Sequence, residues 1–170
     1  YRRGCARPRI CLYGGEPLLR PSMVRRVVDR IWELWSAETR PEVVLCTNGT
    51  LLDRQTIHWL VERDVLIQLS SDGVEPAQML RGEGTFRVLD TTLGGMARDH
   101  PQFVSKRLVI KLTLTAANVP YLAESIQYLL GFGVARIDVV PLDTHDSMWK
   151  EETTRLLEEQ LETVRALFRN

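Results

Sequence analysis

Short clusters of glycine and polar residues occur at five places in this chain, and each follows an apolar run typical of a β-strand. The clusters are Gly14–Pro17, Thr47–Gly49, Ser70–Gly73, Thr113–Asn118 and Pro141–His145. In parallel α/β sheets and barrels, ligands bind at the carboxyl ends of the strands. We therefore expect the five clusters to surround one shared binding site.

The first cluster combines two glycines with a carboxylate. Gly14 and Gly15 lack a Cβ atom, so a ligand can approach their peptide groups closely. Pro17 fixes the direction in which the chain leaves. The carboxylate of Glu16 can hold an ammonium group or orient the turn. Two interpretations stay open, namely a cofactor site and an ordinary turn between a strand and a helix.

The next two clusters offer hydroxyl, amide and carboxylate groups. Thr47 and Asn48 would point toward the site, although an Asn-Gly pair also forms an ordinary turn. Ser70 and Asp72 place a hydroxyl and a carboxylate at a strand end, the combination that holds a ribose in dinucleotide-binding folds. An Asp-Gly turn without a ligand is the alternative.

The last two clusters are less specific. Thr113 and Thr115 project from the same face of their strand because side chains alternate along it, and they also suit an ordinary strand. Asp143, His145 and Asp146 are too few to hold a metal ion without further ligands. We expect them to have loop and helix-capping roles.

The elements that carry these clusters alternate along the chain. Apolar runs predict five strands, at residues 9–13, 43–46, 65–69, 108–114 and 137–140. Helical patterns follow each strand, with first residues expected at Pro21 and Lys150 and capping residues at Asp53, Thr85 and Asn118. Leu161 is expected to face inward on the last helix. Strands that alternate with helices predict an α/β fold with a parallel sheet.

Bulk properties exclude several classes of protein. The 170 residues are 44% hydrophobic and 26% charged, which suits one globular domain. Lys plus Arg equals Asp plus Glu, at 22 each, so charge gives no clear nucleic acid signal. No apolar run reaches the roughly 18 residues of a membrane span, and no signal peptide opens the chain. Three cysteines make a disulfide framework unlikely and favour a cytoplasmic location.

The order of the motifs resembles that of a known family. Gly-Gly-Glu-Pro-Leu-Leu from Gly14, Thr-Asn-Gly-Thr-Leu-Leu from Thr47 and Ser-Ser-Asp-Gly from Ser70 resemble the radical S-adenosylmethionine enzymes in order and interval. The closer resemblance is to the branch that modifies peptides and proteins, which includes the sulfatase-maturating enzymes. Arg81, followed by Gly82–Phe86, matches a further segment of that branch. The resemblance covers about residues 9–145.

This resemblance implies a partial (β/α)6 TIM-like barrel of parallel strands that lacks its first β/α unit. Residues 1–8 would be a basic leader, residues 9–145 the radical S-adenosylmethionine core and residues 146–170 a C-terminal helix. It also implies contacts with S-adenosylmethionine: the amino group at Gly14, Gly15 and Glu16, the ribose at Ser70 and Asp72, a wall at Thr113 and Thr115, and the adenine at Val140 and Leu142. Pro17, Thr47 and Asn48 complete the expected cofactor-binding set.

The family pairs S-adenosylmethionine with a cluster of four irons and four sulfides, which generates a 5′-deoxyadenosyl radical. The resemblance therefore implies an external electron donor and a peptide or protein substrate. The cysteine loop that binds the cluster, Cys-x3-Cys-x2-Cys, is not reproduced by Cys5, Cys11 and Cys46. Because the chain begins with Tyr1 close to a strand, we expect it to be a fragment, with the cysteine loop upstream. The isolated chain is then expected to be inactive.

Two alternatives stay open. The chain could be a cluster-free domain, derived from this fold, that binds a nucleotide or a peptide. It could also be an unrelated barrel-like lyase or hydrolase in which Glu16 and Asp72 act as acid and base. The last alternative requires the two carboxylates to face each other across a pocket.

Overall fold

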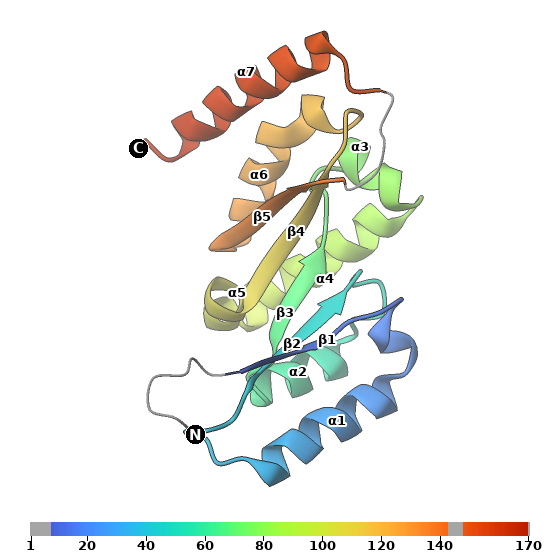
Figure 1. The fold of residues 1–170 in the computed structure, drawn as a ribbon, viewed down its shortest axis with the longest axis vertical. Coiled ribbons are helices and arrows are strands. Elements are labelled where there is room, and N and C mark those ends of the chain that lie inside the picture. The colour runs from blue at the N-terminus through green and yellow to red at the C-terminus, as the bar shows by residue number, and fades with distance from the viewer. Residues whose placement is uncertain (1–7, 143–147, 170) are drawn as a thin grey trace.

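Apolar residues that alternate along short segments form a parallel sheet in the computed structural model, which describes residues 8–142 and 148–169. The five strands lie in sequence order across the sheet (Figure 1). They are β1 (Arg9–Leu12), β2 (Glu42–Thr47), β3 (Leu66–Ser70), β4 (Leu108–Leu114) and β5 (Arg136–Pro141). Each neighbouring pair is parallel. The architecture is an α/β fold consistent with part of a TIM-like barrel, as predicted.

Helical segments connect the strands (Figure 1). The α-helices are α1 (Pro21–Leu34), α2 (Arg54–Glu62), α3 (Glu75–Gln78), α4 (Thr85–Asp99), α5 (Pro101–Arg107), α6 (Leu122–Leu130) and α7 (Glu151–Leu167). Single turns of 3-10 helix, η1 (Pro17–Leu19), η2 (Met79–Arg81) and η3 (Val119–Tyr121), lie at the starts or ends of longer segments.

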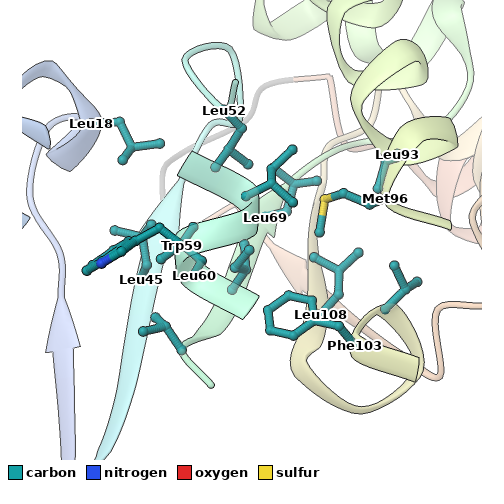
Figure 2. Close-up of a cluster of buried hydrophobic side chains, with 14 of the residues drawn as sticks. Leu18, Leu45, Leu52, Trp59, Leu60, Leu69, Leu93, Met96, Phe103 and Leu108 are labelled. Carbon is teal, nitrogen blue, oxygen red and sulfur yellow. The ribbon is translucent and has the colours of Figure 1, made fainter. Parts of the chain in front are cut away.

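The main core lies between one face of the sheet and the helices. Leu45, Leu69 and Leu108 come from that face and pack in one buried cluster with Leu60 of α2 and Leu93 of α4 (Figure 2). The opposite face carries a separate, smaller buried cluster, formed by Val44, Leu66 and Val109. Alternation of side chains along each strand therefore assigns two different environments to the two faces.

The C-terminal helix shares a second core with the end of the sheet. Leu112 and Leu114 of β4 pack with Leu122 and Ile126 of α6, and half-buried apolar residues of α7 cover them. On α7, however, Leu161 is 51% exposed, so the prediction that it faces inward is wrong. None of the helices in the described ranges is long and apolar enough to cross a membrane.

The starts of α2 and α4 depend on different local features. Asp53 caps α2, because its Oδ1 atom accepts a hydrogen bond from the Thr56 amide at 2.7 Å. The prediction that Thr85 caps α4 is wrong, because Thr85 is the first residue of the helix. Gly84 occupies the cap position with a φ of +78°, and Thr85 donates its hydroxyl proton to the Gly82 carbonyl instead.

Candidate functional site at the carboxyl ends of the strands

The glycine turn after β1 presents open backbone. Gly14 has a φ of +151°, a region that side chains rarely adopt, whereas Gly15 does not have a positive φ. A Cβ atom built on either residue would meet no atom within 4 Å. Both glycines are exposed, and free space adjoins their Cα atoms, so a ligand could approach the backbone of this turn closely.

Glu16 ties this turn to the end of β2. Its Oε1 atom accepts hydrogen bonds from the Leu18 amide at 3.0 Å and from the Thr47 hydroxyl at 2.8 Å. Its Oε2 atom accepts one from the Asn48 amide at 2.8 Å. The carboxylate thus has three donors within the chain, and it orients the turn, one of the two roles that the sequence left open.

The turn after β2 is held by its own side chains. The Thr47 side chain is buried, and its oxygen also accepts from the Gly49 amide at 3.0 Å. The Asn48 Oδ1 atom accepts from both the amide and the hydroxyl of Thr50. Gly49 has a φ of +78°, and a Cβ there would lie 2.4 Å from a Leu69 methyl carbon. Close packing as well as backbone conformation therefore requires this glycine.

Asp72 links the turn after β3 to the end of β4. Its carboxylate receives both arms of the Arg81 guanidinium, at 2.7 and 2.8 Å, and the Thr113 amide at 2.9 Å. Arg81 also donates to the Thr113 hydroxyl at 2.9 Å. Each of the two carboxylates, Glu16 and Asp72, thus already accepts hydrogen bonds from its own set of donors. This arrangement does not support an acid–base pair made from these two residues.

One member of this network, Gln78, was not among the residues predicted from the sequence. Its side chain is 2% exposed, and its Oε1 atom accepts from the Asp72 amide at 2.8 Å. Its Nε2 atom donates to the Thr85 hydroxyl at 3.2 Å. Glutamine is mostly exposed in proteins, so nothing in the composition of a short helix marks a buried one.

The turn after β4 is closed by Asn118. Its Oδ1 atom accepts from the Thr115 amide at 2.9 Å, and its Nδ2 atom donates to the Thr113 carbonyl at 2.8 Å. Asn118 therefore stabilises the turn, and its side chain makes no capping hydrogen bond to the helix that follows, so the prediction that it caps this helix is wrong. Thr115 Oγ1 is buried and has no hydrogen-bond partner among the described residues.

Three further predicted residues, Ser70, Val140 and Leu142, lie at or just after the carboxyl ends of β3 and β5. Ser70 is half-buried at the end of β3. Val140 is 46% exposed and Leu142 is 41% exposed, and the Leu142 amide donates to the Leu114 carbonyl at 2.9 Å. Asp143, His145 and Asp146 lie outside the described residues.

The sheet face that does not pack against the main core carries polar side chains in the strand residues that precede Ser70 and Thr113. Lys111 pairs with Asp138 at 2.6 Å, and Arg136 pairs with the same carboxylate at 2.9 Å. Hydrogen bonds from Arg136 and Lys111 lower the pKa of Asp138. On the next strands, the Cys46 thiol donates to Gln68 Oε1 at 3.0 Å, and burial raises the pKa of this thiol. Buried parallel sheets usually carry apolar residues on both faces, so polar groups here suit a ligand-facing wall.

The described residues do not fit an iron–sulfur cluster. They contain no group of three or more His, Cys, Asp or Glu side chains that could hold a metal ion. Cys11 is exposed, Cys46 is half-buried, and both are free thiols. Cys5 lies outside the described residues.

Comparisons with known proteins agree with this fold. No family model matches the chain. The chain is 31% identical over 130 residues to the uncharacterized protein MJ0907 of Methanocaldococcus jannaschii. The matched region covers 73% of this chain and 43% of MJ0907. The solved structure of anSMEcpe with bound AdoMet gives a TM-score of 0.74 at 17% identity, over 98% of this chain and 47% of that one. The complex of anSMEcpe with AdoMet and the Kp18Cys peptide gives a TM-score of 0.73 at 17% identity, over 94% of this chain and 46% of that one.

The chain has the fold of anSMEcpe. That protein is a radical S-adenosylmethionine sulfatase-maturating enzyme. The chain spans less than half the length of both MJ0907 and anSMEcpe.

Proposed function

We propose that this chain is the S-adenosylmethionine-binding part of a radical S-adenosylmethionine enzyme that modifies a peptide or protein. The observation that carries the proposal is the pair of linked turns at the carboxyl ends of adjacent strands. Glu16 joins the turns after β1 and β2, and Asp72 joins the turns after β3 and β4. They lie in a fold shared with a protein that has been crystallised with AdoMet and a peptide.

Each part of the site has a defined role in this proposal. The open peptide groups of Gly14 and Gly15 would bind the amino group of the methionine moiety. Glu16 would keep that turn in place by accepting hydrogen bonds from the Thr47 hydroxyl and the Asn48 amide, and Pro17 would fix the direction in which the chain leaves it.

The other end of the cofactor would lie against β3, β4 and β5. Ser70 and Asp72 would lie near the ribose, with Asp72 acting through the groups that it positions, since its own oxygens are bonded to Arg81 and Thr113. Thr113 and Thr115 would line the next wall, where Thr115 Oγ1 still lacks a partner among the described residues. The exposed side chains of Val140 and Leu142 would flank the adenine.

The iron–sulfur cluster needs thiolate ligands that the described residues do not supply. In the proposal, these ligands belong to the full-length protein, as does the site for an electron donor. Reductive cleavage of S-adenosylmethionine to a 5′-deoxyadenosyl radical is then an activity of the full-length protein and not of these 170 residues.

The deciding experiment measures the affinity of the full-length protein for S-adenosylmethionine by equilibrium dialysis. Gly15→Val adds a side chain where the free protein has space, so the fold should persist. If the cofactor contacts this backbone, overpacking of about 1–3 kcal/mol should weaken binding by about 5- to 150-fold. Gly95→Ala, in α4 and outside the turn, should bind as the wild type does. Equal affinities for the wild type and Gly15→Val would contradict the proposed site.

A second candidate function rests on the lack of cluster ligands among the described residues. A cluster-free domain of this fold would bind a nucleotide or a peptide at the same strand ends, without redox chemistry. Anaerobic reconstitution of the full-length protein with iron and sulfide separates the two functions. Production of 5′-deoxyadenosine supports the enzyme, whereas binding of S-adenosylmethionine without cluster uptake supports the binding domain.

A further inference from the structure

The opposite end of the sheet from the candidate site contains a cleft of about 660 Å³. Its walls come from the amino ends of the strands, because Arg9 and Glu42 begin β1 and β2, and Asp64 and Arg107 precede β3 and β4. This volume lies within the range of about 300–1,000 Å³ that small-molecule sites occupy. It is not the site to which the five polar clusters belong.

Charged groups dominate the lining of this cleft. It contains the four arginines Arg9, Arg40, Arg63 and Arg107 and the three acids Glu42, Glu62 and Asp64. Arg9 and Arg107 both bind Glu42, at 2.6 and 3.0 Å, and Arg107 also pairs with Asp64 at 3.0 Å. Arg63 pairs with Asp29 at 3.1 Å, and Glu62 lies 3.3 Å from His58. Three of the four guanidinium groups thus have a carboxylate partner.

Arg40 is the exception. Its guanidinium lies over the Trp32 ring, 4.3 Å from the ring centroid, and its Nη2 atom makes one long bond of 3.5 Å to the Trp35 carbonyl. Its Nε atom is buried with no hydrogen-bond partner among the described residues, and no carboxylate there forms an ion pair with it. The seven residues before Pro8 contain three arginines and no acidic residue, so that segment adds no negative charge.

A half-buried guanidinium with no counterion is unfavourable unless an anion accompanies it. Trp32 holds this guanidinium in a fixed place by a cation–π contact, so little side-chain entropy would be lost on binding. We propose that the cleft binds the oxyanion group of a small molecule, a phosphate or a carboxylate, with Arg40 as its main charged contact. The site is separate from the proposed cofactor site, so it stands or falls independently of that function.

Isothermal titration calorimetry of the full-length protein with inorganic phosphate and with succinate, each at constant ionic strength set by sodium chloride, tests this proposal. We expect saturable binding of at least one of the two, and the stronger binder identifies phosphate or carboxylate as the preferred group. Loss of one charge-assisted hydrogen bond should make Arg40→Gln bind at least about tenfold more weakly. Arg155→Gln should bind as the wild type does, because Arg155 is an exposed arginine of α7 that pairs with Glu151.

Arg40→Lys keeps the charge without the planar fork and should bind with intermediate affinity, which guards against a folding defect in Arg40→Gln. Circular dichroism of each variant checks the fold. The proposal is overturned if the wild type binds neither anion above the chloride background. It is also overturned if a folded Arg40→Gln variant binds as tightly as the wild type, since the arginines would then form only a stabilising ion-pair network.

Discussion

Asp72 has a side chain that is only 4% exposed, and Arg81, its ion-pair partner, is 26% exposed. A buried carboxylate that loses its partner is left uncompensated, which destabilises the fold strongly. Because Arg81 is partly solvated, we expect Arg81→Gln to lower the free energy of unfolding by about 2 kcal/mol. Urea denaturation measures the change.

Arg87→Gln is the matched control for that experiment. Arg87 is exposed on α4 and forms no ion pair among the described residues. Its replacement should change the free energy of unfolding by less than about 0.5 kcal/mol. If both variants lose the same stability, the bidentate contact to Asp72 contributes nothing beyond an ordinary surface arginine.

At the scale of the element, Asp53 decides where α2 begins. The hydrogen bond from the Thr56 amide lowers the pKa of this carboxyl below its ordinary value of 3.8. A carboxyl with a lowered pKa in the folded state stabilises the fold above its unfolded pKa, and this contribution is lost as the pH falls through the folded pKa. Asp53→Ala should therefore lower the free energy of unfolding by about 1 kcal/mol near pH 7, and by progressively less as the pH falls below 3.8.

Asp53→Ser separates the cap from the charge. Serine keeps an acceptor for the Thr56 amide. The free energy of unfolding of Asp53→Ser near pH 7 should therefore lie within about 0.3 kcal/mol of that of the wild type. Thermal unfolding followed by circular dichroism over a pH series checks both variants. A difference between Asp53→Ala and the wild type that is constant with pH would show that the ionised carboxylate does not stabilise the cap.

Element boundaries were predictable where local chemistry decides them. Strand β4 was predicted with its observed bounds, because apolar residues alternate throughout Leu108–Leu114. Helix α5 was missed, because Gly94 and Gly95 made the end of α4 uncertain and a second helix starts at Pro101. The prediction of polar clusters at strand ends was correct for the four clusters within the described residues.

The contacts among those clusters were not predictable from the sequence. Glu16 and Thr47 are 31 residues apart, and Asp72 and Thr113 are 41 apart, counted along the chain. Which donor each carboxylate accepts depends on the register between strands and on the path of the turns, neither of which a local pattern contains. The family resemblance supplied the order of the motifs but not their hydrogen bonds.

At the scale of the whole molecule, the sheet has an open edge beside an apolar helix face. Within the described residues, β1 pairs with β2 alone. Next to it, α1 exposes Met23 and Leu34, at 63% and 55%, along a groove that also includes Ile10. Unpaired strand edges and apolar patches of this kind promote association.

We therefore expect the 170-residue chain to self-associate in a concentration-dependent manner, as measured by sedimentation velocity over a dilution series. Burial of one such side chain contributes about 1.5–3 kcal/mol, so replacing both Met23 and Leu34 with lysine should weaken association by at least about tenfold. Leu161→Lys on α7, where Leu161 is 51% exposed, is the matched control and should leave association unchanged. A chain that stays monomeric throughout the dilution series, or equal effects of the two replacements, would contradict this. In the proposed full-length barrel a preceding β/α unit would cover the same edge, so the longer protein should not show this association.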